Sequence, residues 1–150
     1  MHTVKVLFTQ FVTHDTRAYI VEKPPGYTFS PGQATDVAIN VPQWQDQKRP
    51  FTFTSHPDDL VLEFTIKSYP NTPDNDHDGM TEALGLIQAG DELLIDDPWG
   101  TIEYKGPGTF IAAGAGITPF IAVLRQLARQ DQIHHHNLFY SNKQVEDIIY

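Results

Sequence analysis

The residues with the clearest chemical potential form one short segment, residues 49–55, which reads RPFTFTS. An arginine side chain can bind phosphate through two parallel hydrogen bonds, and an aromatic ring can border a flat cofactor. A threonine hydroxyl beside such a ring can bond one of its nitrogen atoms. The segment therefore predicts a site for a flat ligand that carries phosphate. The alternative is an ordinary amphipathic strand with a surface arginine.

Two turns that contain glycine offer places for phosphate groups. Residues 114–119 read GAGITP and lie between an expected strand and an expected helix, where backbone N–H groups can approach a pyrophosphate. The G-x-G-x-x-G pattern of dinucleotide-binding domains is incomplete here, because Pro119 occupies the place of the third glycine, and a lone G-x-G is a common tight turn. Gly79, Met80 and Thr81 precede a short expected helix, so they either hold a second phosphate edge or only cap that helix.

Two other polar clusters do not meet the requirements of a metal site. Residues 74–79 (DNDHDG) resemble the start of a calcium-binding loop, but its twelfth position is Gly85 instead of the required glutamate. His134, His135 and His136 are adjacent in a loop and cannot readily converge on one ion. We therefore expect no metal site. The absence of cysteine excludes disulfides, thiolate metal ligands and cysteine nucleophiles.

Composition narrows the class of protein further. A chain of 150 residues with 40% hydrophobic content can bury a core. No stretch approaches the roughly 18 apolar residues of a membrane helix. The formal net charge of -9 disfavours nucleic acid and anionic membranes as partners. Without cysteine or a targeting segment, we expect a cytoplasmic protein.

The secondary structure expected to position these residues changes near residue 107, from short strands to a strand–helix–strand unit. Earlier segments alternate between apolar and polar residues, as from Leu60 onward, which is typical of antiparallel strands with one buried face. One short helix is expected to start near Thr81 and stop at Gly90. The expected strands are 4–12, 17–22, 34–40, 51–55, 60–67 and 92–96.

The last part of the chain predicts a strand, a helix and a second strand at 109–113, 119–130 and 137–141, which is a βαβ unit with Thr118 as the helix N-cap. Residues 146–150 are expected to begin another helix, so we expect an α/β unit that is incomplete within these 150 residues. The predicted organisation is an antiparallel β-barrel at residues 1–106, followed by the first part of an α/β nucleotide-binding domain at residues 107–150.

Taken in order, the three motifs resemble those of the ferredoxin–NADP reductase family, particularly bacterial flavodoxin or ferredoxin reductases. Residues 29–33 (FSPGQ), 98–100 (PWG) and 138–142 (LFYSN) also match, so the resemblance spans nearly the whole chain. It implies a Greek-key, flavin-binding barrel joined to an NAD(P)-binding domain. It also implies FAD as the cofactor, with NADPH or NADH as the co-substrate.

The resemblance assigns roles to single residues. Arg49 would contact the flavin diphosphate, Phe51 would border the isoalloxazine ring, and Thr52 would face flavin N5 as the residue with a catalytic role. The family usually has tyrosine where this chain has Phe51, so a hydroxyl bond is lost. The implied cofactor-binding residues are Arg49, Pro50, Phe51, Thr52, Thr65, Ile66, Lys67, Gly79, Met80, Thr81, Gly114, Gly116, Thr118, Ser141 and Lys143.

The choice between the two nicotinamide nucleotides depends on the end of the last expected strand. By resemblance, Thr118 would lie near the nicotinamide carboxamide, and Ser141 and Lys143 would lie where the family discriminates the adenosine ribose. No Asp or Glu ends that strand to accept a hydrogen bond from a ribose 2'-hydroxyl, and Lys143 could pair with a 2'-phosphate. This pattern favours NADPH. The alternative is that Lys143 is an ordinary surface lysine.

The implied function is electron transfer between NAD(P)H and a carrier protein such as flavodoxin or ferredoxin, by way of FAD. Because the family's last strands carry further nucleotide contacts, we expect weak or absent turnover from these 150 residues alone. The acidic composition would repel an acidic carrier unless basic groups cluster locally. Two alternatives stay open: the reductase component of an oxygenase, with the same two sites and another acceptor, and a non-catalytic flavin-binding module.

Overall fold

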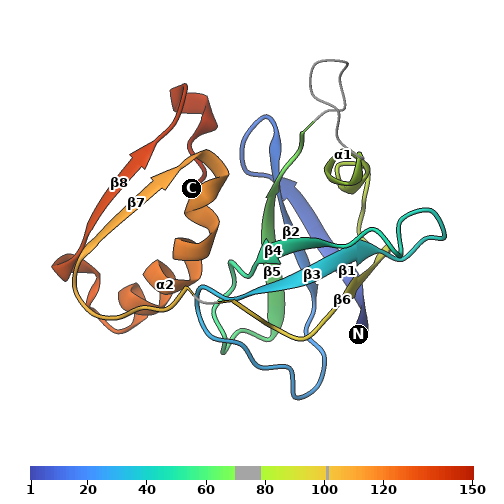
Figure 1. The fold of residues 1–150 in the computed structure, drawn as a ribbon, viewed down its shortest axis with the longest axis horizontal. Helices are drawn as coiled ribbons and strands as arrows, with labels where there is room; N and C mark the ends of the chain where they lie inside the picture. Colours follow the sequence, from blue (N-terminus) through green and yellow to red (C-terminus); the bar gives the residue numbers. More distant parts are fainter. Residues whose placement is uncertain (70–78, 101) are drawn as a thin grey trace.

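The computed structural model describes residues 1–69, 79–100 and 102–150. Its first unit is one antiparallel sheet in the order β4-β3-β6-β1-β2-β5. A bridge between Phe53 and Phe64 joins the two edge strands, so the sheet nearly closes and the predicted antiparallel barrel is confirmed (Figure 1). The strands are β1 (His2–Phe11), β2 (Thr16–Glu22), β3 (Ala34–Ile39), β4 (Arg49–Thr52), β5 (Val61–Lys67) and β6 (Glu92–Ile95).

Alternation along the strands explains why the barrel has a single interior. On β5, Leu62, Phe64 and Ile66 are buried, while Glu63 and Lys67 on the opposite face stay partly exposed. Phe53 is fully buried at the centre of the core and stacks on Phe29 with ring centroids 4.2 Å apart. The core cluster draws on β1, β2, β3, β5, β6 and the short helix α1 (Met80–Leu84).

Two expectations about the barrel need correction. Leu60 was expected on the buried face, but it lies in the turn before β5 and is 92% exposed. The helix expected to run to Gly90 ends at Leu84, where the N–H of Gly85 bonds the carbonyls of Thr81 and Glu82. The sequence that resembles a calcium loop, residues 74–79, falls almost entirely outside the described residues.

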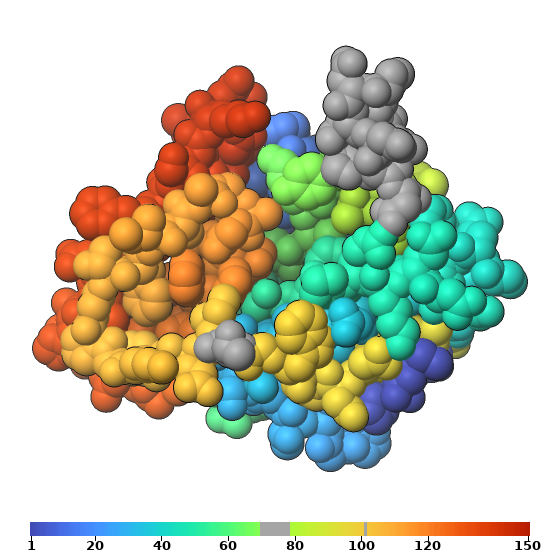
Figure 2. Space-filling view, in the orientation of Figure 1, coloured from blue at the N-terminus to red at the C-terminus, as the bar shows by residue number. Residues whose placement is uncertain are grey.

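The second unit is the predicted parallel βαβ arrangement. A 3-10 turn, η1 (Gly114–Ile117), leads from the first strand into the helix α2 (Thr118–Arg129), which lies between the strand pair and the barrel (Figure 1). Figure 2 shows the atoms of this second unit packed against one side of the barrel. On the strand face away from α2, Ile111 and Phe139 lie opposite each other and are 75% and 65% exposed. The main elements are β7 (Thr109–Ala113), α2 (Thr118–Arg129) and β8 (Asn137–Ser141).

The helix expected from residue 146 does not form in this structure. A 3-10 turn, η3 (Val145–Asp147), is followed by Ile148 in an extended conformation. This path lets Ile149 join a small apolar cluster with Ala112, Ile117 and Ile121, against which Val12 of the barrel also packs. A further short turn, η2 (Ile133–His135), precedes β8. Among the described residues, the helices all fall short of the length and apolar character that crossing a bilayer requires.

Candidate functional site between the two units

A cleft of about 710 Å³ lies between the barrel and the second unit. Its barrel side comes from the β1–β2 turn and the end of β5, and its other side comes from the carboxyl ends of β7 and β8. Ligands of open parallel sheets bind beyond such strand ends. The cleft brings together four residues that the sequence singles out: Lys67, Gly114, Ser141 and Lys143.

The turn after β7 leaves open space for a ligand. Gly114 has a φ of 48°, and a Cβ atom built on Gly114 or on Gly116 would meet nothing within 4 Å. The hydroxyl of Tyr140 donates to the Gly114 carbonyl at 3.1 Å and so fixes the turn from the β8 side. The prediction that Thr118 is the N-cap is wrong: Thr118 already has helical angles and makes no capping bond, because the 3-10 turn takes the place of a capped start.

The side chain of Asn142, at the cleft wall, has polar atoms with no partner. Both its amide nitrogen and its amide oxygen are buried without a hydrogen bond among the described residues. Buried polar groups in native proteins nearly always have partners, so such an amide is a candidate for contact with a ligand or water. Ser141 and Lys143 on either side of it are exposed.

An ion pair borders the barrel side of the cleft. Lys67 Nζ lies 2.8 Å from the Asp15 carboxylate, and this bond raises the pKa of Lys67. Burial alone would raise the pKa of Asp15, but bonds from Lys67, Thr13 and Thr16 outweigh it and hold that pKa below its ordinary value. His14, Asp15 and Asp147 lie close enough to share an ion, yet Lys67 already occupies the Asp15 carboxylate, so we assign no metal there.

The residues of β4 lie on the rim of the barrel. Phe51 is half-buried against the barrel core, and Thr52 is half-buried at the end of the strand. Pro50 is exposed. The Arg49 guanidinium donates to the Lys48 carbonyl at 2.7 Å and is partly exposed. A cation, a ring and a hydroxyl therefore follow one another along one rim strand.

The remaining predicted residues divide between the barrel surface and its core. Gly79 has a φ of 78°, and a Cβ atom there would lie 3.6 Å from the Trp44 ring. The Thr81 hydroxyl accepts a hydrogen bond from the Tyr69 N–H at 3.3 Å. Ile66 and Met80 point into the core, with 4% and 1% exposure, so any contact they make with a cofactor would have to come from the main chain.

The start of α1 is separate from the cleft. Gly79 lines a groove of about 810 Å³ with Trp44, and this groove shares no lining residue with the cleft near Lys67 and Gly114. The residues predicted for one extended cofactor thus divide between the α1 groove, the β4 rim and β5, where Thr65 and Ile66 are buried.

Comparison with known proteins decides the family. Residues 3–104 match the oxidoreductase FAD-binding domain family, and residues 110–150 match the oxidoreductase NAD-binding domain family. The chain belongs to the FAD-binding family. The predicted resemblance to ferredoxin–NADP reductases is confirmed at the level of these two domains and of the fold. The proposed boundary at residues 106 and 107 stays a prediction.

Two relatives and one solved structure illustrate the match. The reductase component of propane 2-monooxygenase from Rhodococcus jostii is 28% identical over 132 residues, which cover 85% of this chain and 34% of the relative. NADH-cytochrome b5 reductase 2 from Mycosarcoma maydis is 30% identical over 149 residues, with 91% and 41% covered. The chain thus spans roughly a third to two fifths of these relatives.

The solved structure is a ferredoxin NADP+ reductase from Neisseria gonorrhoeae with bound FAD and NADP. It superposes with a TM-score of 0.82 at 21% identity, covering 99% of this chain and 60% of that one. This match supports the shared fold.

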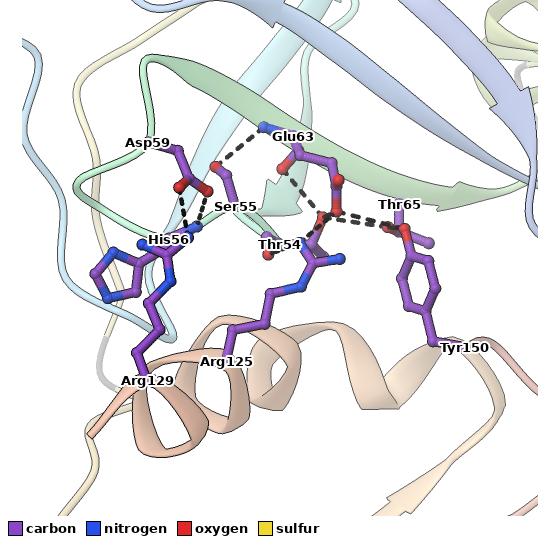
Figure 3. A network of polar contacts seen from close by, with 9 residues as sticks. All are labelled: Thr54, Ser55, His56, Asp59, Glu63, Thr65, Arg125, Arg129 and Tyr150. Carbon is purple, nitrogen blue, oxygen red and sulfur yellow. Dashed lines mark hydrogen bonds and ion pairs between the residues drawn. The ribbon is translucent and has the colours of Figure 1, made fainter. Parts of the chain in front are cut away.

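Sequence reasoning missed the contacts that join the FAD-binding barrel to the second unit. Figure 3 shows Arg125 and Arg129 reaching from α2 to the barrel, with Tyr150 beside them. Arg125 donates to the Glu63 carboxylate at 2.7 Å, and Arg129 lies 2.7 Å from the Asp59 carboxylate. The only sequence signal was the polar outer face of residues 60–67, which cannot identify a partner.

Proposed function

We propose that this member of the family moves electrons from NAD(P)H, by way of FAD, to a protein carrier such as flavodoxin or ferredoxin. The observation that carries the proposal is the cleft in which Lys67 of the FAD-binding domain faces Gly114, Ser141 and Lys143 of the NAD-binding domain. Bound FAD supplies the hydride-accepting ring, and the protein supplies binding and orientation.

The described residues fit these two ligands in their chemistry. Gly114 and Gly116 leave space for a diphosphate in the turn before α2, where main-chain N–H groups could approach it. The Asn142 amide, which has no partner in the part of the chain that the structure describes, can bond a nucleotide or a bridging water. On the flavin side, Arg49 would neutralise phosphate, with Thr81 as a further donor from the α1 start.

Within the flavin site, Phe51 would border the ring, and Thr52 would present its hydroxyl to the ring edge where hydride arrives. Thr65 and the main chain of Ile66 and Lys67 would contact the opposite edge. Thr118 would lie near the nicotinamide. We propose NADPH as the preferred donor, because Lys143 lines the cleft and no carboxylate ends β8.

A second candidate acceptor is the oxygenase component of a multicomponent oxygenase. Two observations favour it: the similarity to the propane 2-monooxygenase reductase component, and 30% identity over 126 residues with the electron transfer component of toluate 1,2-dioxygenase from Pseudomonas putida. The two site halves would serve either acceptor.

Anaerobic titration tests the proposal directly. The full-length protein is loaded with FAD and titrated with NADPH and with NADH while the visible flavin absorbance is followed. We expect a yellow protein that NADPH bleaches at lower concentration than NADH, and we expect Lys143→Ala to remove that preference. A colourless polypeptide that retains neither FAD nor FMN would refute the proposal. Flavin that binds but resists both nucleotides would favour a non-catalytic flavin-binding module.

Thr52→Val tests the catalytic assignment. Valine keeps the shape of the side chain and removes the hydroxyl. We expect nearly unchanged FAD binding, and a rate of flavin reduction that falls by roughly tenfold, which is about 1.4 kcal/mol of transition-state stabilisation. An unchanged rate would remove Thr52 from the site.

A further inference from the structure

Helix α2 is joined to the barrel by two arginines on one side. Arg125 and Arg129 are four residues apart, so both project from the same helix face. Arg129 lies 2.7 Å from Asp59 in an exposed position, whereas the Arg125 side chain is only 35% exposed. The better shielded pair is therefore the one between Arg125 and Glu63.

Arg125 contacts two segments of the barrel through one nitrogen, the residues after β4 and strand β5. Its NH1 atom donates to the Thr54 carbonyl at 2.6 Å and to the Glu63 carboxylate at 2.7 Å. Its guanidinium carbon also lies 5.3 Å from the centre of the Tyr150 ring. A charged donor that binds a main-chain carbonyl and a carboxylate together fixes both position and direction.

The Glu63 carboxylate is held in place by its own neighbours. The Thr54 hydroxyl donates to the same carboxylate oxygen at 2.7 Å, and the Glu63 N–H donates to Ser55 Oγ at 3.0 Å (Figure 3). Thr54 and Thr65 hydroxyls lie 3.1 Å apart, and Thr65 also lies 3.2 Å from the Tyr150 hydroxyl. Arg125 thus meets a network that is ordered on the barrel side.

This network lies between the two halves of the proposed site along the chain segments that carry them. Thr54 and Glu63 each lie two residues from a predicted flavin contact, Thr52 and Thr65, and therefore on the same side of their extended segments. Arg125 lies seven residues after Thr118, which is two helical turns or about 10 Å along the same face of α2.

We propose that Arg125 is a positioning residue, which sets the placement of the nucleotide-binding turn relative to the flavin-binding strands. The inference rests on the proposed function. Hydride transfer requires the reacting atoms to approach to about 3–3.5 Å, so a small change in how α2 sits would slow the reaction more than it weakens either ligand. Arg125 itself touches neither the proposed flavin contacts nor the nucleotide turn.

The kinetic test compares Arg125→Ala, Arg125→Lys and the control Lys105→Ala, which removes one exposed cation from outside the network. Each variant of the full-length protein is loaded with FAD and mixed anaerobically with increasing NADPH, and the limiting reduction rate is separated from the half-saturating concentration. For Arg125→Ala we expect a limiting rate lower by roughly tenfold or more, with FAD affinity and half-saturation changed by less than about twofold. Arg125→Lys should recover much of the rate, because one ammonium can replace the single NH1 contact. Lys105→Ala should match the parent.

A second measurement does not depend on the cofactors. Amide hydrogen exchange of the unloaded chain reports how firmly Thr118–Arg129 is docked. We expect faster exchange in that helix for Arg125→Ala and for Glu63→Gln, near-parental exchange for Arg125→Lys, and no change for Lys105→Ala.

The two measurements distinguish this inference from the proposed function. A parent protein that is never reduced would count against the proposed function, and the exchange data would still test whether the Arg125–Glu63 contact holds α2 against the barrel. Parental exchange and a parental reduction rate in Arg125→Ala would overturn the inference. Equal losses of rate and FAD affinity would also overturn it, because they would indicate general damage to the fold.

Discussion

The barrel and the βαβ unit of this protein differ in how much apolar surface each buries within itself. The barrel core draws on five strands and a helix and is centred on the fully buried Phe53. The second unit has a small cluster around Ile121 and leaves Ile111 and Phe139 largely exposed on one strand face. The barrel therefore supplies a well-packed frame for the proposed flavin-binding residues, whereas the position of the proposed nucleotide-binding turn depends on how α2 is held against that frame.

The largest effect should come from the barrel core. Phe53→Ala should lower the free energy of unfolding by about 3–5 kcal/mol, because it removes a ring that packs against Phe29 and Phe64 and leaves a cavity. Phe139→Ala, on the exposed face of β8, should change it by less than about 0.5 kcal/mol. Urea unfolding of both variants measures the difference. Equal losses would break the comparison between the two units.

On the flavin side of the barrel, Arg49→Ala should weaken FAD binding by about 10- to 100-fold. A hydrogen bond to a charged group contributes about 1.5–3 kcal/mol, and the variant removes the cation that would meet the diphosphate. Quenching of FAD fluorescence during titration measures the affinity. Arg49→Lys keeps the charge and should lose less. An alanine variant with parental affinity would place the diphosphate elsewhere.

On the nucleotide side, Gly114→Ala should weaken NADP+ binding by roughly tenfold, because a methyl group would occupy the space where N–H groups approach a phosphate. It should also cost about 1–2 kcal/mol of stability, since Gly114 has a left-handed φ of 48°. Gly116→Ala is the matched control for strain, because Gly116 has no such φ. Calorimetric titration with NADP+ and urea unfolding separate the two effects, and parental NADP+ binding by both variants would rule out this turn.

The smallest effect should come from the exposed ion pair between Arg129 and Asp59, as a pH dependence of the free energy of unfolding. Burial alone would raise the pKa of Asp59, but bonds from Arg129 and from the His56 N–H outweigh it and lower that pKa below its ordinary 3.8. A carboxylate with a lowered pKa in the folded state stabilises above pH 3.8, and this contribution disappears as the pH falls through the lowered value.

Asp59→Asn should therefore be less stable than the parent at pH 7, by less than about 1 kcal/mol. The difference should vanish in acid below the folded pKa of Asp59. Urea unfolding between pH 7 and pH 2 measures it, and Asp58→Asn at the exposed neighbouring position is the control. A difference that stays constant over that range would show that the Arg129 pair contributes nothing.

Local patterns predicted most of the fold and the chemical types in the site. The alternation in residues 60–67 identified β5 and its inward residues, but it placed Leu60 inside because alternation alone does not show where a turn ends. Thr118 had the residue type of an N-cap, yet the backbone enters α2 through a 3-10 turn. Errors of this kind arise where two local conformations are close in energy and tertiary packing selects one.

The sequence by itself determined the barrel strands, the glycine turn before α2 and the kinds of groups available to hold phosphates and a flat ring. Only the tertiary structure decided that Lys67 shares a cleft with Gly114, that the Asn142 amide is buried without a partner among the described residues, and that Arg125 meets Glu63 across 62 positions of the chain. The physical reason is that periodicity and turn chemistry act between neighbours along the chain. Contacts between units arise only after the barrel has closed and α2 has packed against it.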